Sequence, residues 1–165
     1  HKHRWAFTLL IVFVLVQLTL PLRHYLYEGN VSWTEQGHRF AWHMKLRSKQ
    51  CQAVFYVQKS PDEPREQIDN LAFLSARQNR KMSSRPYMIR DFAYYLRKEY
   101  GGVQNPNIKV FVWSHCSLNS RAYQTFIDPT IDISRQSWHW GFDLEPWIIP
   151  LNTPLPPANR YTKGY

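Results

Sequence analysis

The chain has 165 residues, which is the length of a single domain. Its 21 Lys and Arg residues exceed its 12 Asp and Glu residues, giving a formal charge of +9, and 16% of its residues are aromatic. This composition is typical of nucleic-acid binders, because cations contact phosphates and rings stack on bases. The first predicted element argues against that class, because it places the domain across a membrane, so no nucleic-acid partner is expected.

Residues 5–22, WAFTLLIVFVLVQLTLPL, contain no charged side chain. As a helix this run reaches about 27 Å, close to the roughly 30 Å of a bilayer core, so it predicts one membrane-spanning helix. Lys2 and Arg4 precede it, which favours a cytoplasmic N-terminus and a periplasmic, lumenal or extracellular domain. A cleaved signal peptide is the less favoured alternative, because QLTLPLRHYL offers no small-x-small cleavage site.

The change in hydrophobicity and composition along the sequence divides the chain into four predicted parts. Residues 1–22 form the cytoplasmic flank and the spanning helix, and residues 23–32, rich in Arg, His and Tyr, form an interfacial collar. Residues 33–150 form the extracytoplasmic domain, and residues 151–165 form a Pro-rich extended tail. The chain begins with His rather than Met, so we expect it to start inside a longer gene product or to follow processing.

The domain is predicted to be β-rich, because runs of β-branched and aromatic residues recur along it. Its strands are expected at residues 40–46, 51–58, 107–118 and 122–128. The run at 107–118 is apolar on both faces and is therefore predicted to be the central strand. Residues 59–67 read as a loop, and residues 69–85 as a short helical turn with a basic loop.

Residues 86–100 predict the best helix of the domain, amphipathic through Met88, Phe92, Tyr95 and Leu96. Because the strands do not alternate with helices, the expected fold is membrane-anchored α+β: one N-terminal transmembrane helix, then an antiparallel, sandwich-like, β-rich domain with one amphipathic helix.

Two modification sites are predicted. Cys51 and Cys116 are the only cysteines, and both lie on predicted strands in an oxidising compartment. A disulfide between neighbouring strands and two buried free thiols are equally compatible with the sequence. The sequence NVS makes Asn30 a glycosylation acceptor if the source is eukaryotic.

The sequence predicts no catalytic residue, cofactor-binding residue or metal ligand. His38, His43, His115 and His139 lack the spacing of a zinc motif. Neither a Gly-rich phosphate loop nor a G-x-S-x-G elbow occurs.

The stretch WTEQGHRFAWHMKL, residues 33–46, mixes rings with charges where the chain leaves the membrane. Its candidates for the membrane junction or the rim of a pocket are Trp33, His38, Phe40, Trp42 and His43. In one interpretation the three rings hold the domain on the bilayer surface, as amphipathic rings do.

Three ordered segments resemble a known family. They are LPLRHYLYEGNVSWTEQGHRFAWHMKLRSK at 20–49, IKVFVWSHCSLNSRAYQTFIDPTIDI at 108–133 and DLEPW at 143–147. Together they resemble the end of the membrane region and the lumenal domain of vitamin K-dependent gamma-carboxylase and its bacterial homologues, the horizontally transferred transmembrane domain proteins. The resemblance implies a last membrane helix leading into a β-rich extracytoplasmic domain. It also implies that residues 33–42 border the family's catalytic chamber.

The resemblance implies a chemistry that this chain carries only in part. The family carboxylates glutamate side chains with carbon dioxide and oxygen, driven by epoxidation of reduced vitamin K, and its lysine base lies upstream of the matching region. We therefore expect a single-pass accessory or interaction subunit of a larger membrane complex rather than a carboxylase by itself. Its expected partners are the lipid bilayer and other membrane subunits. The alternative is a fragment or split half of a carboxylase-like enzyme, which alone would require reduced vitamin K.

Overall fold

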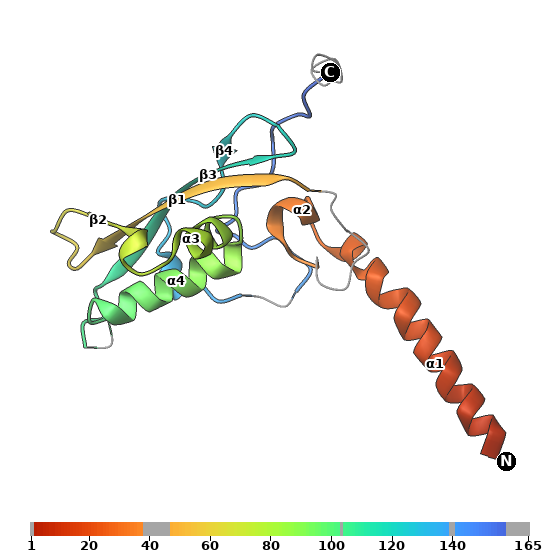
Figure 1. The fold of residues 1–165 in the computed structure, drawn as a ribbon. Helices are drawn as coiled ribbons and strands as arrows, with labels where there is room; N and C mark the ends of the chain where they lie inside the picture. The colour runs from red at the N-terminus through yellow and green to blue at the C-terminus, as the bar shows by residue number, and fades with distance from the viewer. Residues whose placement is uncertain (1, 38–46, 103, 139–140, 158–165) are drawn as a thin grey trace.

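The structure is a computed structural model of the chain and describes residues 2–37, 47–102, 104–138 and 141–157. Its first element is the apolar helix α1 (Lys2–Leu22), which projects from the folded domain as an isolated rod (Figure 1). The segment Arg4–Leu26 is long and apolar enough to cross a membrane, and only 6% of its most apolar window is buried by the chain. The predicted spanning helix is present, with its apolar surface uncovered by the domain.

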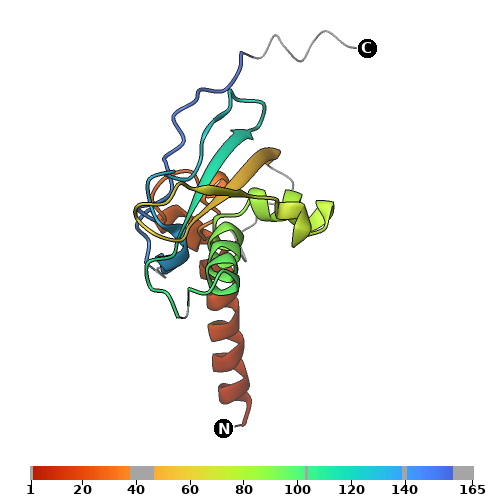
Figure 2. The same ribbon diagram turned by 90° about the vertical axis from the view of Figure 1, so that its left-hand side faces the viewer.

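Two short helical turns connect α1 to the domain (Figure 1), which lies beyond the C-terminal end of α1 in Figure 2. The 3-10 helix η1 (Arg23–Leu26) follows α1 directly. The single-turn helix α2 (Val31–Thr34) begins after Asn30, whose side-chain oxygen accepts a hydrogen bond from the Ser32 amide at 3.0 Å. Such an N-cap supplies an acceptor to an otherwise unpaired amide, so the segment predicted as a collar is locally ordered.

The domain is built on one four-stranded antiparallel sheet with the order β2-β1-β3-β4. Its strands are β1 (Lys49–Gln58), β2 (Glu66–Ile68), β3 (Lys109–Leu118) and β4 (Gln124–Thr125). The two long strands pair over their whole length, from Lys49 opposite Leu118 to Gln58 opposite Lys109. The prediction that the strand at 107–118 is central is confirmed.

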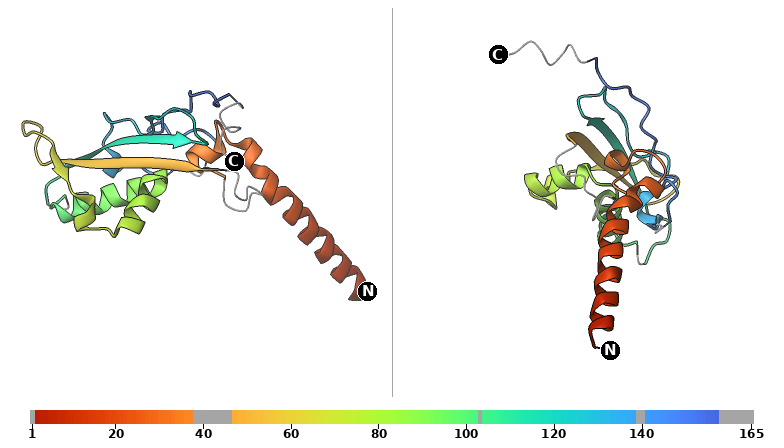
Figure 3. Two further views of the ribbon diagram at one scale, coloured as in Figure 1. Left: turned by 45° about the horizontal axis from the view of Figure 1, so that its top comes forward. Right: turned by 90° about the vertical axis from the view of Figure 1, so that its right-hand side faces the viewer.

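Helices cover one face of the sheet (Figure 3). They are α3 (Ala76–Ser83) and α4 (Pro86–Glu99), with the 3-10 turns η2 (Asn70–Ala72) and η3 (Ile133–Arg135). Phe55 on β1 meets Phe92 on α4 edge to face, with ring centroids 4.9 Å apart. The fold is α+β with an antiparallel sheet and an amphipathic helix, as predicted, and helices form the layer on this face of the described sheet.

Helix α4 buries a slightly different stripe from the predicted one. Its fully enclosed side chains include Ile89, Ala93 and Leu96. Burial of Ile89 and of Leu96 contributes about 1.5–3 kcal/mol each relative to exposure. Met88 packs only partly against the core, and Tyr95 is exposed. The buried stripe is therefore rotated around the helix relative to the predicted one. It consists of residues 89, 92, 93 and 96, which have the i, i+3, i+4, i+7 spacing of one helix face.

Three short elements differ from the prediction. Helix α3 forms where a turn and a basic loop were expected, and it begins with a capping box between Ser75 and Gln78. Strand β2 lies at the end of the predicted Pro-rich loop, and β4 has only two of the residues predicted for the strand at 122–128. The strand predicted at 40–46 lies outside the described residues.

Candidate membrane-junction site

Trp33 joins the end of the membrane helix to the domain core. The residue is fully buried, and its indole Nε1 donates a hydrogen bond to the backbone oxygen of Ile149 at 2.8 Å. Its ring packs edge to face against Phe126 at 4.8 Å between centroids. Trp33 thus packs inside the protein and ties α2 to the C-terminal segment, instead of lying on the bilayer surface.

The three segments that carry the family resemblance meet at this point. Ile127 forms an isolated antiparallel bridge with Ile148, and the Asp128 amide donates to the backbone oxygen of Trp147 at 3.0 Å. The Trp147 indole in turn donates to the Glu145 carboxylate at 3.1 Å, where both residues are buried. IDPTIDI, DLEPW and Trp33 therefore form one packing unit that holds the tail against the sheet.

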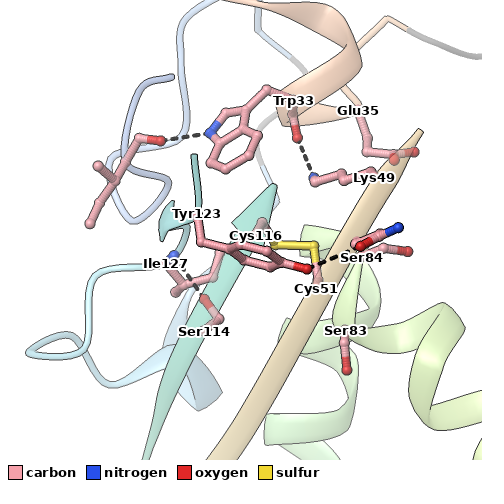
Figure 4. The surroundings of a disulfide bond; sticks show 12 residues. Trp33, Glu35, Lys49, Cys51, Ser83, Ser84, Ser114, Cys116, Tyr123 and Ile127 are labelled. Atoms are coloured by element: carbon pink, nitrogen blue, oxygen red, sulfur yellow. Dashed lines mark hydrogen bonds between the residues drawn. A yellow bond between two sulfur atoms is a disulfide. The ribbon is translucent and has the colours of Figure 1, made fainter. Parts of the chain in front are cut away.

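Lys49 places an amine inside this unit. Its ammonium donates to the backbone oxygen of Trp33 at 2.6 Å (Figure 4) and lies 3.6 Å from the ring centroid of Phe126. Burial lowers the pKa of Lys49 from 10.5 to about 7, although the nearby Glu35 carboxylate acts to raise it; Arg47 adds to the lowering. Glu35 itself is ion-paired with Arg47.

Cys51 and Cys116 lie opposite each other on β1 and β3 and are joined as a disulfide, with an S–S distance of 2.00 Å (Figure 4). Both sulfurs are on the helix-covered face of the sheet, two residues along β1 from Lys49. The bond crosses the long β1–β3 ladder near the junction, so it connects the strand that follows the membrane segment to the central strand.

A cavity of about 320 Å³ opens beside this unit, where α1 meets the domain. It is lined by residues from the helix end, the α2 turn, α4 and the C-terminal segment: Arg23, Tyr27, Glu35, Gln36, Gly37, Tyr87, Arg90 and Trp138. We call it the junction cavity. Its two arginines come from positions far apart in sequence, and Arg90 also contacts the exposed Asp91 carboxylate at 2.5 Å.

Backbone and amide contacts fix the walls of the junction cavity. The Gln36 side chain donates from Nε2 to the backbone oxygen of Asp143 at 2.9 Å, and the Glu28 amide donates to the backbone oxygen of Phe142 at 2.9 Å. Gly37 has a φ of +66°, and a Cβ there would lie 2.5 Å from the Tyr27 ring. A side chain at Gly37 would therefore displace Tyr27 from the cavity wall.

The face of the sheet away from α3 and α4 carries a cluster of rings, of which Phe111 is buried. Its side chains are Val54 and Tyr56 on β1 and Phe111, Trp113 and His115 on β3, which are paired across the strands; we call this the aromatic face. The Trp113 and His115 rings stack at 4.4 Å, and 39% of Trp113 is exposed. The Arg65 guanidinium lies 3.6 Å from the Phe111 centroid, beside a hollow of about 280 Å³.

The structure describes only part of the predicted junction set. Trp33 is at the junction but does not line the cavity. His38, Phe40, Trp42 and His43 lie outside the described residues. Asn30, the glycosylation candidate, is exposed and caps α2.

The sequence interpretation missed Lys49, Gln36 and Arg90. Lys49 reads as an ordinary solvated residue before a strand, and only its partners on distant segments bury it. Arg90 lies outside the apolar stripe predicted for its helix, yet it borders the junction cavity. In the part of the chain that the structure describes, no three His, Cys, Asp or Glu residues gather as a metal site.

A model of one protein family matches residues 2–154, and it describes the lumenal domain of vitamin K-dependent gamma-carboxylase. The chain belongs to this gamma-carboxylase lumenal-domain family. The match includes α1, the Trp33 unit, the disulfide and every residue that lines the junction cavity. No solved structure matches the chain. The match therefore assigns a lumenal-type domain to this chain, in which the apolar helix α1 is attached at the N-terminal side.

Proposed function

We propose that the chain is a membrane-anchored interaction subunit of a larger membrane protein complex, with its N-terminus in the cytoplasm and its domain beyond the membrane. The aromatic face is the observation that carries this proposal. Protein interfaces are enriched in Tyr, Trp and Arg, and Tyr56, Trp113 and Arg65 line a hollow on the aromatic face.

The anchor supports the same role. Helix α1 is apolar on all sides and is covered by almost none of the chain, so lipid or neighbouring helices would surround it. The Trp33 unit fixes the domain to the end of this helix through the hydrogen bond to Ile149. A partner bound at the aromatic face would thus be held at a constant height above the bilayer.

The second candidate is one half of a carboxylase-like enzyme, which the family match favours. The described residues do not fit reduced vitamin K as a complete site. Its apolar ring and tail would need enclosing walls within the membrane, whereas α1 is the one described helix there and packs against nothing. A catalytic bundle would therefore come from outside the described residues, and the isolated chain should show no carboxylation with reduced vitamin K.

Photocrosslinking tests the interaction role. The photoreactive residue benzoylphenylalanine replaces Trp113 on the aromatic face. In the matched control it replaces Tyr94, which lies on α4 and is 61% exposed. Irradiation of native membranes should give a discrete adduct with a multi-span membrane protein at position 113 and none at position 94. The absence of a position-113 adduct, or equal crosslinking at both positions, would overturn the proposal. Carboxylation by the purified adduct partners would favour the second candidate.

A further inference from the structure

The outer side of the helix layer faces the direction in which α1 leaves the domain. Helices α3 and α4 lie on the side of the sheet toward which α1 extends (Figure 1 and Figure 2). Ile89 and Leu96 of α4 belong to the core that the helices form with the sheet, so the opposite side of the helices faces away from the sheet. With α1 in a bilayer, this outer side faces the membrane surface from which α1 emerges.

Large apolar and aromatic side chains are exposed on this outer side. Leu71, Phe73, Tyr94 and Tyr95 are each at least 36% exposed. The rings of Phe73 and Tyr95 meet edge to face, with centroids 6.0 Å apart. Clusters of exposed apolar side chains mark surfaces that bind a partner or a membrane. Tyrosine suits the membrane boundary in particular, because its ring is apolar and its hydroxyl can stay in water.

Cations accompany these side chains. Arg77, Arg80 and Lys81 are exposed, and they have the i, i+3, i+4 spacing of one face of α3. None of the three forms an ion pair in the part of the chain that the structure describes. Lys98 adds an exposed cation on α4, one turn after Tyr94. The outer side therefore combines free positive charges with amphipathic rings.

Acidic side chains offset only part of this charge. Residues 69–99 contain seven Lys and Arg but three Asp and Glu, which leaves an excess of four positive charges. Of the acids, Asp91 contacts Arg90 at 2.5 Å, Asp69 caps η2 through its carboxylate, and Glu99 is the last residue of α4. Each cation near an anionic bilayer favours its binding by roughly five-fold. The charge of this side is thus complementary to anionic lipid.

We propose that this side is a second membrane contact, which lies on the headgroups of anionic phospholipids beside α1. The four apolar or aromatic side chains and the four cations named above form it, and we call them the outer helical surface. The rings enter the headgroup region while the cations bind lipid phosphates. The proposal rests on α1 crossing the bilayer. It does not depend on a partner of the aromatic face, which lies on the other side of the sheet.

Quenching by headgroup spin labels measures this contact in the purified full chain. The fluorophore nitrobenzoxadiazole is attached to Tyr94→Cys or, as the matched control, to Tyr123→Cys. Tyr123 is 54% exposed and contacts Gln50 on the opposite face of the sheet. The chain is placed in spin-labelled nanodiscs of phosphatidylcholine alone or of equal parts phosphatidylcholine and phosphatidylglycerol. Quenching at position 94 should exceed quenching at position 123, and it should increase when phosphatidylglycerol is present.

Two variant pairs locate the charge that is responsible. R77Q/R80Q should lower the ratio of bound to released domain on anionic discs by roughly 25-fold, as expected for two cations. K59Q/K109Q removes the same charge from exposed positions at the end of the β1–β3 ladder far from the junction, and should change the ratio less than about two-fold. Salt at about 1 M shortens the Debye length to roughly 3 Å and should act as R77Q/R80Q does.

A third label separates the anchor from the surface. Val14 lies within α1, so the fluorophore on Val14→Cys should be quenched by acyl-chain spin labels in both lipid mixtures. Quenching at position 14 with none at position 94 would overturn the lipid contact and favour a protein partner for the outer helical surface. No quenching at position 14 would overturn the anchor and this proposal with it.

The role of the cations has its own contradicting result. Equal quenching at position 94 on neutral and anionic discs, or unchanged quenching in R77Q/R80Q, would overturn it. If R77Q/R80Q does not fold, the lipid and salt comparisons on the chain labelled at position 94 decide the question.

Discussion

At the scale of single residues, Lys49 is the most unusual side chain in the domain. Charged amines are almost never enclosed by rings in a core, yet this one lies between Trp33 and Phe126. The arrangement satisfies the backbone oxygen of Trp33 with a strong donor. It also makes the stability of the junction depend on the protonation state of one amine.

The fold should become more stable as the pH rises above neutrality. Burial lowers the Lys49 pKa to about 7 in the folded state from 10.5 when exposed, so between these values the unfolded chain carries a proton that the folded chain lacks. Stability then increases with pH by at most about 1.4 kcal/mol per unit. Below pH 7 both states are protonated and this dependence vanishes.

The variant Lys49→Met tests the assignment through the Tm measured in detergent between pH 7 and pH 9. The Tm of the unaltered chain should rise between pH 7 and pH 9 by more than the Tm of Lys49→Met does, because the variant has no amine at position 49 to titrate. The control Lys81→Met removes an exposed lysine, and its Tm should rise between pH 7 and pH 9 as much as that of the unaltered chain. Parallel Tm profiles for the chain and Lys49→Met would contradict the buried position of the amine.

The sequence could not reveal this environment, although it pointed to its neighbour. The mixture of rings and charges at residues 33–46 predicts a membrane junction, whereas the partners of Trp33 inside the domain are Phe126 and Ile149. Periodicity describes which face of an element is apolar and says nothing about contacts over such separations. For the same reason the helical pattern of residues 86–100 could not show that Arg90 borders the junction cavity.

At the scale of elements, the predictions succeeded where a long, uniform pattern existed. The apolar run became α1, and the alternating runs became the long strands β1 and β3. Helix α3 was missed because it has a highly polar sequence, although Ser75 and Gln78 form a recognisable capping box. Strand β2 has three residues, too few for a period to show.

The disulfide between β1 and β3 should be a major stabilising element. Cys51 and Cys116 are 65 residues apart, and closing a loop of this size removes enough entropy from the unfolded chain to stabilise the fold by about 4 kcal/mol. Protein isolated without reductant should weigh two hydrogens less than reduced protein. Reductant should lower the free energy of urea unfolding by about 2–5 kcal/mol.

The double variant Cys51→Ala/Cys116→Ala is the control for this effect, since its stability should not respond to reductant. An unaltered chain whose mass and unfolding curve are the same with and without reductant would show that the two thiols are free.

At the scale of the whole molecule, the chain is an apolar rod joined to a compact domain through the Trp33 unit. Composition and the apolar run were enough to predict this division and the α+β class. The junction cavity was not predictable, because its walls come from the helix end, α2, α4 and the C-terminal segment. Only the folded arrangement brings Arg23, Gln36 and Arg90 together.

We propose that the helix crosses the membrane and leaves the domain on the extracytoplasmic side. The most direct measurement is labelling of Glu63→Cys, an exposed position between β1 and β2, with a membrane-impermeant maleimide in sealed right-side-out vesicles. Position 63 should be labelled without detergent, while a cysteine added ahead of residue 1 should be labelled only after detergent opens the vesicles. Labelling of position 63 that requires detergent, or that occurs together with the N-terminal cysteine, would contradict the account.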